Sequence, residues 1–196
     1  PPRRDRRAAV QVVSEAVADA RAGVDSGATA RVAEPNWKLS ADRAAECRMP
    51  LCYGGGVKTV SQAGQVIGLG VEKIGVSSAA IETPELISGA AQEVGGQSVV
   101  VIIDARKDRR TGQYLAWTHN GTRNTGRSVI DVAQQAEALG AGEVVVNSID
   151  NDGKMNGYDL ALAKSVRQAV HLPISLLGGA GSLADIGSLV ASCGTV

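Results

Sequence analysis

The segment that decides the fold is residues 144–153, VVVNSIDNDG. A run of β-branched apolar residues leads directly into two acids, two asparagines and a glycine. Such an apolar run is typical of a parallel strand that is covered on both faces. In a parallel (β/α) barrel, the side chains that follow the carboxyl ends of the strands line the mouth where substrates bind. The segment therefore predicts a buried strand that ends at a functional rim.

Short apolar strands alternate with helical patterns from about residue 49 onward. The strand patterns are β-branched and cover residues 49–53, 72–77, 98–104, 143–149 and 173–177. Between them, apolar residues recur three and four positions apart in residues 60–69, 84–94, 128–139, 160–170 and 183–191. The repeated order of strand and helix predicts an α/β fold with a parallel sheet and helices outside it.

Glycines repeat in the same register along these units. GGG at residues 54–56 and GGAG at residues 178–181 each follow a strand pattern and precede a helix. Helical patterns end at Gly70, Gly140 and Gly194, as left-handed C-caps require. The repeat favours a parallel (β/α)8 TIM-type barrel, and an open doubly wound sheet is the alternative.

The composition is that of one soluble domain with a single core. The 196 residues include 20 basic and 20 acidic side chains, 44% apolar residues and 3% aromatics. Balanced charge and a pI near 7.2 favour neither a nucleic-acid nor a membrane partner. No apolar run is long enough to span a membrane, the first residues lack a secretory core, and the three cysteines show neither disulfide nor zinc spacing. We therefore expect a cytoplasmic protein without a bound metal or cofactor.

Two aspartates are the candidate catalytic groups. Asp104 closes the strand pattern SVVVIID, and Asp150 follows VVVNSI. One strand-terminal aspartate often only caps the next loop, but two on different strands of one rim favour a functional interpretation. By contrast, His119 and Trp117 are expected to be loop and packing residues, and Cys52 is expected to pack inside a strand.

The two glycine turns are candidate phosphate sites. Their exposed backbone amides and the N-terminus of the following helix attract anions, although left-handed backbone alone also explains glycine. Two such turns at one mouth predict a substrate with two phosphates. Ser77 and Ser78, at the end of EKIGVSS, can add donors to the first turn or cap a helix.

These motifs together resemble the cyclase subunit of imidazole glycerol phosphate synthase, a histidine-biosynthesis barrel family. The resemblance extends from about residue 34 to the last residue. It rests on PLCYGGGVKT, VVVIIDARK, THNGTRNTG, GAGEVVVNSIDNDGKMNGYD and PISLLGGAGS. EPN at residues 34–36, PLCYGGG and HNGT at residues 119–122 are more similar to the branch found in surface-polysaccharide gene clusters. In that branch the partners deliver ammonia for making an amidino sugar.

The resemblance implies a lyase that uses ammonia released from glutamine by a separate glutaminase subunit, in a heterodimer. Ammonia passes through the barrel and serves to cleave and cyclise a phosphoribulosyl aminoimidazole ribonucleotide that carries a phosphate at each end. The implied products are imidazole glycerol phosphate and an aminoimidazole carboxamide ribotide.

The resemblance also implies roles for individual residues. Asp104 matches the acid/base that transfers protons to the ring-closing atoms. Asp150 matches a mouth carboxylate that helps to orient the substrate, and Asn120 lies near the closing ring. Residues 107–125 resemble a mobile loop over the mouth. The residues that match phosphate-binding positions are Gly55, Gly56 and Ser78 at one end of the substrate, and Gly179 and Gly181 at the other.

The first 50 residues depart from the family pattern. The family's first strand ends in a second catalytic aspartate and its second strand ends in an acid, and neither strand is visible here. Residues 8–22 have the pattern of an amphipathic helix, and residues 24–33 are too rich in Gly, Ser, Ala and Asp for a buried strand. We interpret residues 1–196 as one partial barrel domain in which residues 1–33 form an atypical helical segment.

The chain also stops where an eighth strand would begin. We therefore expect a barrel that is incomplete at both ends, with little cyclase activity and with marginal stability or self-association. Two other functions stay open. One is a non-catalytic remnant barrel that docks a glutaminase partner, and the other is a different bis-phosphate isomerase, against which VVVIIDARK and SIDNDG weigh.

Overall fold

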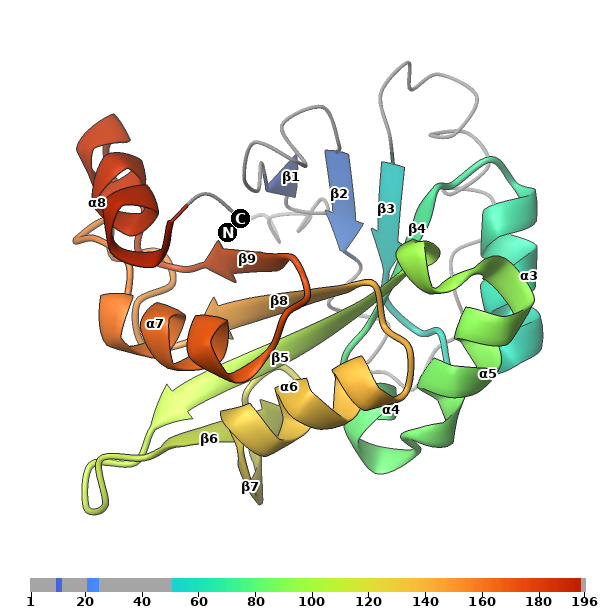
Figure 1. The fold of residues 1–196 in the computed structure, drawn as a ribbon, viewed down its shortest axis with the longest axis horizontal. Helices are drawn as coiled ribbons and strands as arrows, with labels where there is room; N and C mark the ends of the chain where they lie inside the picture. Colours follow the sequence, from blue (N-terminus) through green and yellow to red (C-terminus); the bar gives the residue numbers. More distant parts are fainter. Residues whose placement is uncertain (1–9, 12–20, 25–50, 195–196) are drawn as a thin grey trace, which may run out of the picture.

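The computed structural model describes residues 10–11, 21–24 and 51–194, in which strands and helices alternate (Figure 1). The strands are β1 (Val10–Gln11), β2 (Arg21–Val24), β3 (Leu51–Gly54), β4 (Lys73–Val76), β5 (Val99–Lys107), β6 (Tyr114–Thr118), β7 (Arg123–Ser128), β8 (Glu143–Ser148) and β9 (Ile174–Leu177). The helices are α3 (Val60–Gly68), α4 (Ser78–Glu82), α5 (Glu85–Val94), the 3₁₀ helix η1 (Gly96–Ser98), α6 (Val129–Ala138), α7 (Leu160–Ala169) and α8 (Leu183–Cys193).

The central part of the sheet is parallel and runs in the order β2, β3, β4, β5, β8 and β9. The short strand β1 pairs antiparallel with β2, and β6 and β7 continue antiparallel from the end of β5. The sheet curls, with α3 and α5 side by side near one end and α6 and α7 alongside the β5, β8 and β9 strands (Figure 1). This arrangement is part of a (β/α)8 barrel, as the sequence predicts.

Polar residues define where the helices begin. Thr59 and Gln62 form a reciprocal capping box at α3, in which each side chain accepts a hydrogen bond from the other residue's backbone amide. Ser128 and Asp159 accept hydrogen bonds from backbone amides in the first turns of α6 and α7. These caps satisfy amides that have no partner within their helix, and they fix where each helix begins.

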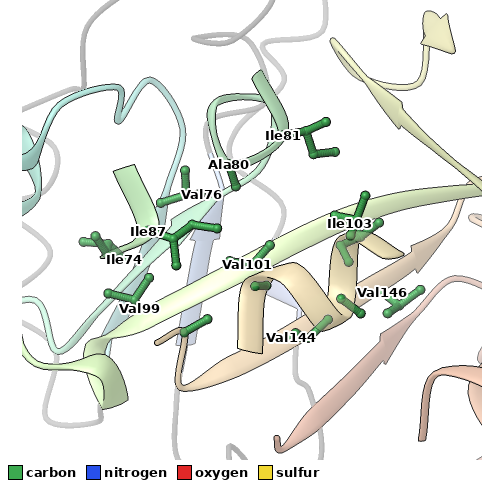
Figure 2. Packing of buried hydrophobic residues seen from close by; sticks show 14 of the residues in the cluster. Ile74, Val76, Ala80, Ile81, Ile87, Val99, Val101, Ile103, Val144 and Val146 are labelled. Carbon is green, nitrogen blue, oxygen red and sulfur yellow. The ribbon is translucent and has the colours of Figure 1, made fainter. Parts of the chain in front are cut away.

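The apolar core lies between the sheet and the helices. Alternate residues of β4, β5 and β8 point outward into it, including Ile74, Val101 and Val144, which are completely buried. From the helical layer, Ile87 of α5 and Ala80 of α4 pack against these side chains (Figure 2). The sequence predicts that the strand segments 72–77, 98–104 and 143–149 are covered on both faces. Packing against the helices covers the outer of these two faces.

The other face of the same strands carries a buried polar group at the amino ends. Glu143 is only 5% exposed; its Oε2 lies 2.8 Å from Lys73 Nζ and its Oε1 accepts a hydrogen bond of 2.7 Å from Ser175 Oγ. Burial raises the pKa of the Cys52 thiol to about 12, and the charge of Glu143 adds to the effect while that of Lys73 opposes it. Cys52 therefore packs inside a strand, as predicted, and its thiol stays protonated and unreactive at neutral pH.

Residues 107–125, which resemble a loop in sequence, are largely a β-hairpin. β5 extends beyond the parallel sheet and its last four residues pair with β6, which in turn pairs with β7. The hydroxyl of Tyr114 on β6 donates to Asp159 at the start of α7, with Oδ1 and Oδ2 at 2.8 and 2.9 Å. The loop interpretation was thus wrong for the paired residues. Pairing with β5 orders Tyr114–Thr118, whose residues favour strands, and this strand in turn stabilises the polar, glycine-containing Arg123–Ser128.

The expected helix at residues 8–22 is corrected at both of its described ends. Val10–Gln11 and Arg21–Val24 are extended, and the second segment pairs in parallel with β3. Pairing with the edge of β3 outweighs the helical periodicity of this segment. The remainder of that helix, and residues 25–33, lie outside the described residues.

None of the helices in the described ranges combines the length and apolarity that are needed to cross a membrane.

Candidate active site at the carboxyl ends of the strands

Asp104 lies near the carboxyl end of β5, between two neighbouring strands. It is the register partner of Asn147 on β8 and of Trp117 on β6. Asn147 Nδ2 donates a hydrogen bond of 2.9 Å to Asp104 Oδ1. Because paired residues of adjacent strands point to the same face, the three side chains share the inner face of the sheet at its mouth.

The surroundings of Asp104 favour its protonated form. Burial raises the pKa of this half-buried carboxyl above its ordinary value, the hydrogen bond from Asn147 opposes the rise, and the charge of Asp152 adds to it. A carboxyl whose pKa is raised above its ordinary value holds its proton more readily, which is a property that acid/base catalysis uses.

Asp150 follows β8 at the same rim but contacts a different residue. Its Oδ1 lies 3.3 Å from Nε of Arg106, and the side chains of Arg106 and Asp150 are 34% and 49% exposed. The Arg106 guanidinium lies over the ring of Trp117, 4.6 Å from the ring centroid. The structure therefore groups Asp104 with Asn147 and Asp152, and Asp150 with Arg106 and Trp117.

The first glycine turn follows β3 and has left-handed backbone. Gly55 and Gly56 have φ of 128° and 73°, which L side chains rarely adopt. Ser77 is the N-cap residue of α4 but makes no capping hydrogen bond with its side chain, and the neighbouring Ser78 is buried. Both features lie just beyond the carboxyl ends of adjacent parallel strands, so the predicted phosphate residues Gly55, Gly56 and Ser78 lie along one stretch of the rim.

The tip of the β6–β7 hairpin docks onto this stretch. Ser78 Oγ accepts a hydrogen bond of 3.0 Å from the backbone amide of His119. His119 and the exposed Asn120 both have positive φ, 54° and 56°, a conformation that costs a non-glycine residue about 1 kcal/mol. Glu82 of α4 forms an ion pair with Arg123, at the other end of the hairpin turn, with 3.3 Å between Glu82 Oε1 and Arg123 Nη1. Asn120 is thus brought to the mouth, and the Ser78 hydroxyl is shared with the hairpin.

The second glycine turn follows β9 and is closely packed by backbone. A side chain at Gly179 would place its Cβ 2.1 Å from the carbonyl oxygen of Gly157, and φ at Gly179 is +108°. The amide of Gly181 donates to Asp185 Oδ2 at 3.0 Å, and Asp185 caps α8 together with Ser182. The hydrogen bond from the Gly181 amide, followed by those from the hydroxyl and the amide of Ser182, lowers the pKa of Asp185. The Gly181 amide, predicted to contact phosphate, is therefore already bonded to a carboxylate of its own helix.

Comparison with known proteins adds to this geometry. A model of the family described as "Histidine biosynthesis protein" matches residues 5–194. The chain belongs to the histidine biosynthesis protein family. A protein of Leptospira borgpetersenii named "Putative imidazole glycerol phosphate synthase subunit HisF" is 46% identical over 188 residues, which is 96% of this chain and 74% of that protein.

Two further relatives of the histidine biosynthesis family cover a similar region. One from Vibrio vulnificus, whose name contains the numbered form hisF3, is 44% identical over 93% of this chain and 70% of its own length. "Imidazole glycerol phosphate synthase subunit HisF" of Myxococcus xanthus is 38% identical over 86% of this chain and 66% of its own length. The resemblance found in the sequence motifs is thereby confirmed at the level of the family.

Some residues at the mouth of this histidine biosynthesis family member were not singled out from the sequence. Asn147 was treated as part of the buried strand, although its alternation with Glu143 and Val145 places it on the inner face. Asp152 is one of the two acids that the sequence places at the rim, but no role for it, or for Arg106, follows from the sequence alone. Only the register of β5 with its neighbours brings them to Asp104.

Within the described residues, no three histidine, cysteine or acidic side chains are arranged to hold a metal ion.

Proposed function

We propose that this chain is a cyclase of the imidazole glycerol phosphate synthase type. It uses ammonia, supplied by a glutaminase partner subunit, to cleave and cyclise an aminoimidazole ribonucleotide with a phosphate at each end. The observation that carries the proposal is Asp104, a half-buried carboxyl with a raised pKa that is bonded to Asn147 at the carboxyl-end rim. The names of the relatives support the same reaction.

In this proposal Asp104 moves the protons. Attack by ammonia, ring closure and release of the ribotide each change the protonation of a nitrogen or oxygen atom, so one group must donate and accept in turn. The Asn147 hydrogen bond fixes one carboxyl oxygen and leaves the other to face the substrate. Asp152, whose charge raises the pKa of Asp104, keeps the proton available.

The phosphate groups are assigned to the two glycine turns. Gly55 and Gly56, with the Ser78 hydroxyl as a donor, would bind one phosphate, and Gly179 the other. The Gly181 amide would contribute only after Asp185 moves, since Asp185 Oδ2 occupies it. Asp150 and Asn120 are assigned to substrate orientation.

A turnover assay with the bis-phosphorylated ribonucleotide and excess ammonium tests the proposal without requiring the partner. Imidazole glycerol phosphate and the carboxamide ribotide should form in equal amounts. The sequence predicts little activity for an incomplete barrel, so slow formation of both products would agree with the proposal. A folded protein that forms neither product at a detectable rate, with ammonium or with a glutaminase subunit and glutamine, would contradict it. Binding of the glutaminase without turnover would instead favour a non-catalytic docking role.

Amidino-sugar synthesis is the second candidate. EPN at residues 34–36 and HNGT at residues 119–122 favour it. Turnover of the ribonucleotide would be weak in that case. Ammonia delivery to a sugar-modifying acceptor enzyme, measured as glutamine-dependent product in a reconstituted mixture, separates the two functions.

A further inference from the structure

Arg106 is the cation that β5 places beside the proposed catalytic acid. It lies two residues after Asp104 on the same strand, so both side chains point to the inner face at the mouth. Its register partner on β6 is Leu115, one diagonal step from Trp117, and the guanidinium lies 4.6 Å from the centre of the Trp117 ring. This cation–π contact with Trp117 holds the guanidinium against the hairpin.

Hydrogen bonding to Arg106 is incomplete. Nε is buried, and it finds no hydrogen-bond acceptor in the described part of the chain, although Asp150 Oδ1 lies 3.3 Å away. Stacking and charge therefore hold this side chain, not aligned hydrogen bonds. An arginine held in this way can exchange its carboxylate neighbour for another oxyanion without breaking a well-formed hydrogen bond.

The mouth needs such a cation if its ligand is anionic. Asp104 lies near the carboxyl end of β5, and Asp150 and Asp152 follow β8 at the same rim. A substrate with two phosphate groups would meet this acidic edge and be repelled unless a positive charge lay among the acids. Arginine also matches the geometry of a phosphate through paired N–H groups.

We propose that Arg106 binds an anionic phosphate-ester group of the substrate, with Trp117 as its platform and Asp150 as its neighbour in the ligand-free protein. The inference rests on the proposed function for the identity of the substrate. Arg106 would act in binding and not in proton transfer, so its loss should weaken affinity more than it slows the bound substrate.

Lys107 provides a matched control. It is the next residue of β5, points to the opposite face and lies over the Tyr114 ring, with Nζ 5.2 Å from the centroid. Arg106→Gln and Lys107→Gln each remove one positive charge from adjacent positions. Only the first removes it from the face that carries Asp104.

The kinetic test uses the full protein with excess ammonium. Arg106→Gln should raise KM for the bis-phosphorylated ribonucleotide by about ten- to a hundredfold while kcat changes by less than about threefold. Lys107→Gln should leave KM within about twofold, and Arg106→Lys should give an intermediate KM because it keeps the charge but loses the planar fork. An unchanged KM in Arg106→Gln, or an equal rise in Lys107→Gln, would overturn the assignment.

A binding test does not depend on turnover. The chain has two tryptophans, Trp37 and Trp117. In a Trp37→Phe variant, all tryptophan fluorescence therefore comes from Trp117. Inorganic phosphate should change that emission saturably, and Arg106→Gln should abolish the change while circular dichroism shows an unaltered fold. A folded Arg106→Gln protein that responds like its parent would refute the role of Arg106. If the parent binds phosphate through Arg106 but turns over no ribonucleotide, the proposed function fails and the Arg106 site stands.

Discussion

Asp104 and Asn147 face each other across the β5–β8 ladder, and Asn147 Nδ2 donates a 2.9 Å hydrogen bond to Asp104 Oδ1. This bond favours the ionised carboxylate, whereas burial, the larger effect, favours the protonated acid. The opposition holds Asp104 in a fixed orientation with a raised pKa. Such a combination is characteristic of a functional site, because stability alone would favour an uncharged residue there.

The raised pKa makes Asp104 a source of pH-dependent instability. A carboxyl whose pKa is higher in the folded than in the unfolded protein contributes stability that is full below the unfolded value, near 3.8, and is lost as pH rises through the folded value. Asp104→Asn should therefore be more stable than the parent at pH 7, and the difference should vanish toward pH 4. Urea denaturation across this range measures it, and a variant that is less stable at pH 7 would show that the ionised carboxylate is stabilised in the fold.

Tyr114 should connect the hairpin to α7. Tyr114→Phe removes the hydroxyl that donates to Asp159, and we expect a loss of about 1–2 kcal/mol in the free energy of unfolding at pH 7. Burial and Asp159 raise the pKa of Tyr114 to about 12, so this stability is present below pH 10 and is lost between pH 10 and about 12. Denaturation at pH 7 and pH 11 should therefore show a smaller difference between variant and parent at pH 11, and equal differences would argue against the hydrogen bond.

Close backbone approach at Gly179 should make it intolerant of any side chain. Gly179→Ala combines a φ of +108° with a Cβ 2.1 Å from the Gly157 carbonyl oxygen, and we expect a loss of about 3 kcal/mol or more. Gly112→Ala is the control, because φ is +75° there but no atom lies within 4 Å, so about 1 kcal/mol is expected. Similar thermal denaturation midpoints for the two variants would mean that the backbone at Gly157 can move away from the added Cβ at little energetic cost.

The buried ion pair at the amino ends of the strands should show coupling. Glu143→Gln removes the charge that faces Lys73 and should cost about 2–3 kcal/mol, below the value for a fully buried pair because Lys73 is 31% exposed. Lys73→Met in the same background should recover part of the loss, since no unpaired charge then remains. Strictly additive effects of the two substitutions in denaturation experiments would exclude such coupling.

The sequence predicts the repeating strands and helices well, because their apolar patterns coincide with the tertiary packing. Residues 143–149 are an example, since the whole segment is buried except for Asn147 and Ile149, which are half-buried. The strand that carries Asp104 was predictable for the same reason, but its end was not: β5 continues past Asp104 to Lys107, where it pairs with β6. The phosphate-binding and substrate-orienting roles assigned to the other site residues, from Gly55 to Gly181, are still predictions. All of these residues follow the carboxyl ends of strands or lie in the hairpin.

Features that depend on register were not predictable from local sequence. The β6–β7 hairpin forms on the extended end of β5, although residues 118–128 include no apolar residue. β2 forms by pairing with β3 although its sequence, RAGV, has weak strand propensity. Arg106 and Asn147 become mouth residues only through these pairings, and the Asp185 bond to the Gly181 amide requires the turn at the start of α8.

The most direct test of the account is the ammonium-dependent turnover of Asp104→Asn compared with the parent protein. Asparagine keeps the size of the side chain and an oxygen that can accept from Asn147, but it cannot exchange a proton. Turnover should fall by roughly two to four orders of magnitude while KM for the bis-phosphorylated ribonucleotide stays within about threefold. An Asp104→Asn protein with near-normal turnover would contradict the assignment of Asp104 as the acid/base.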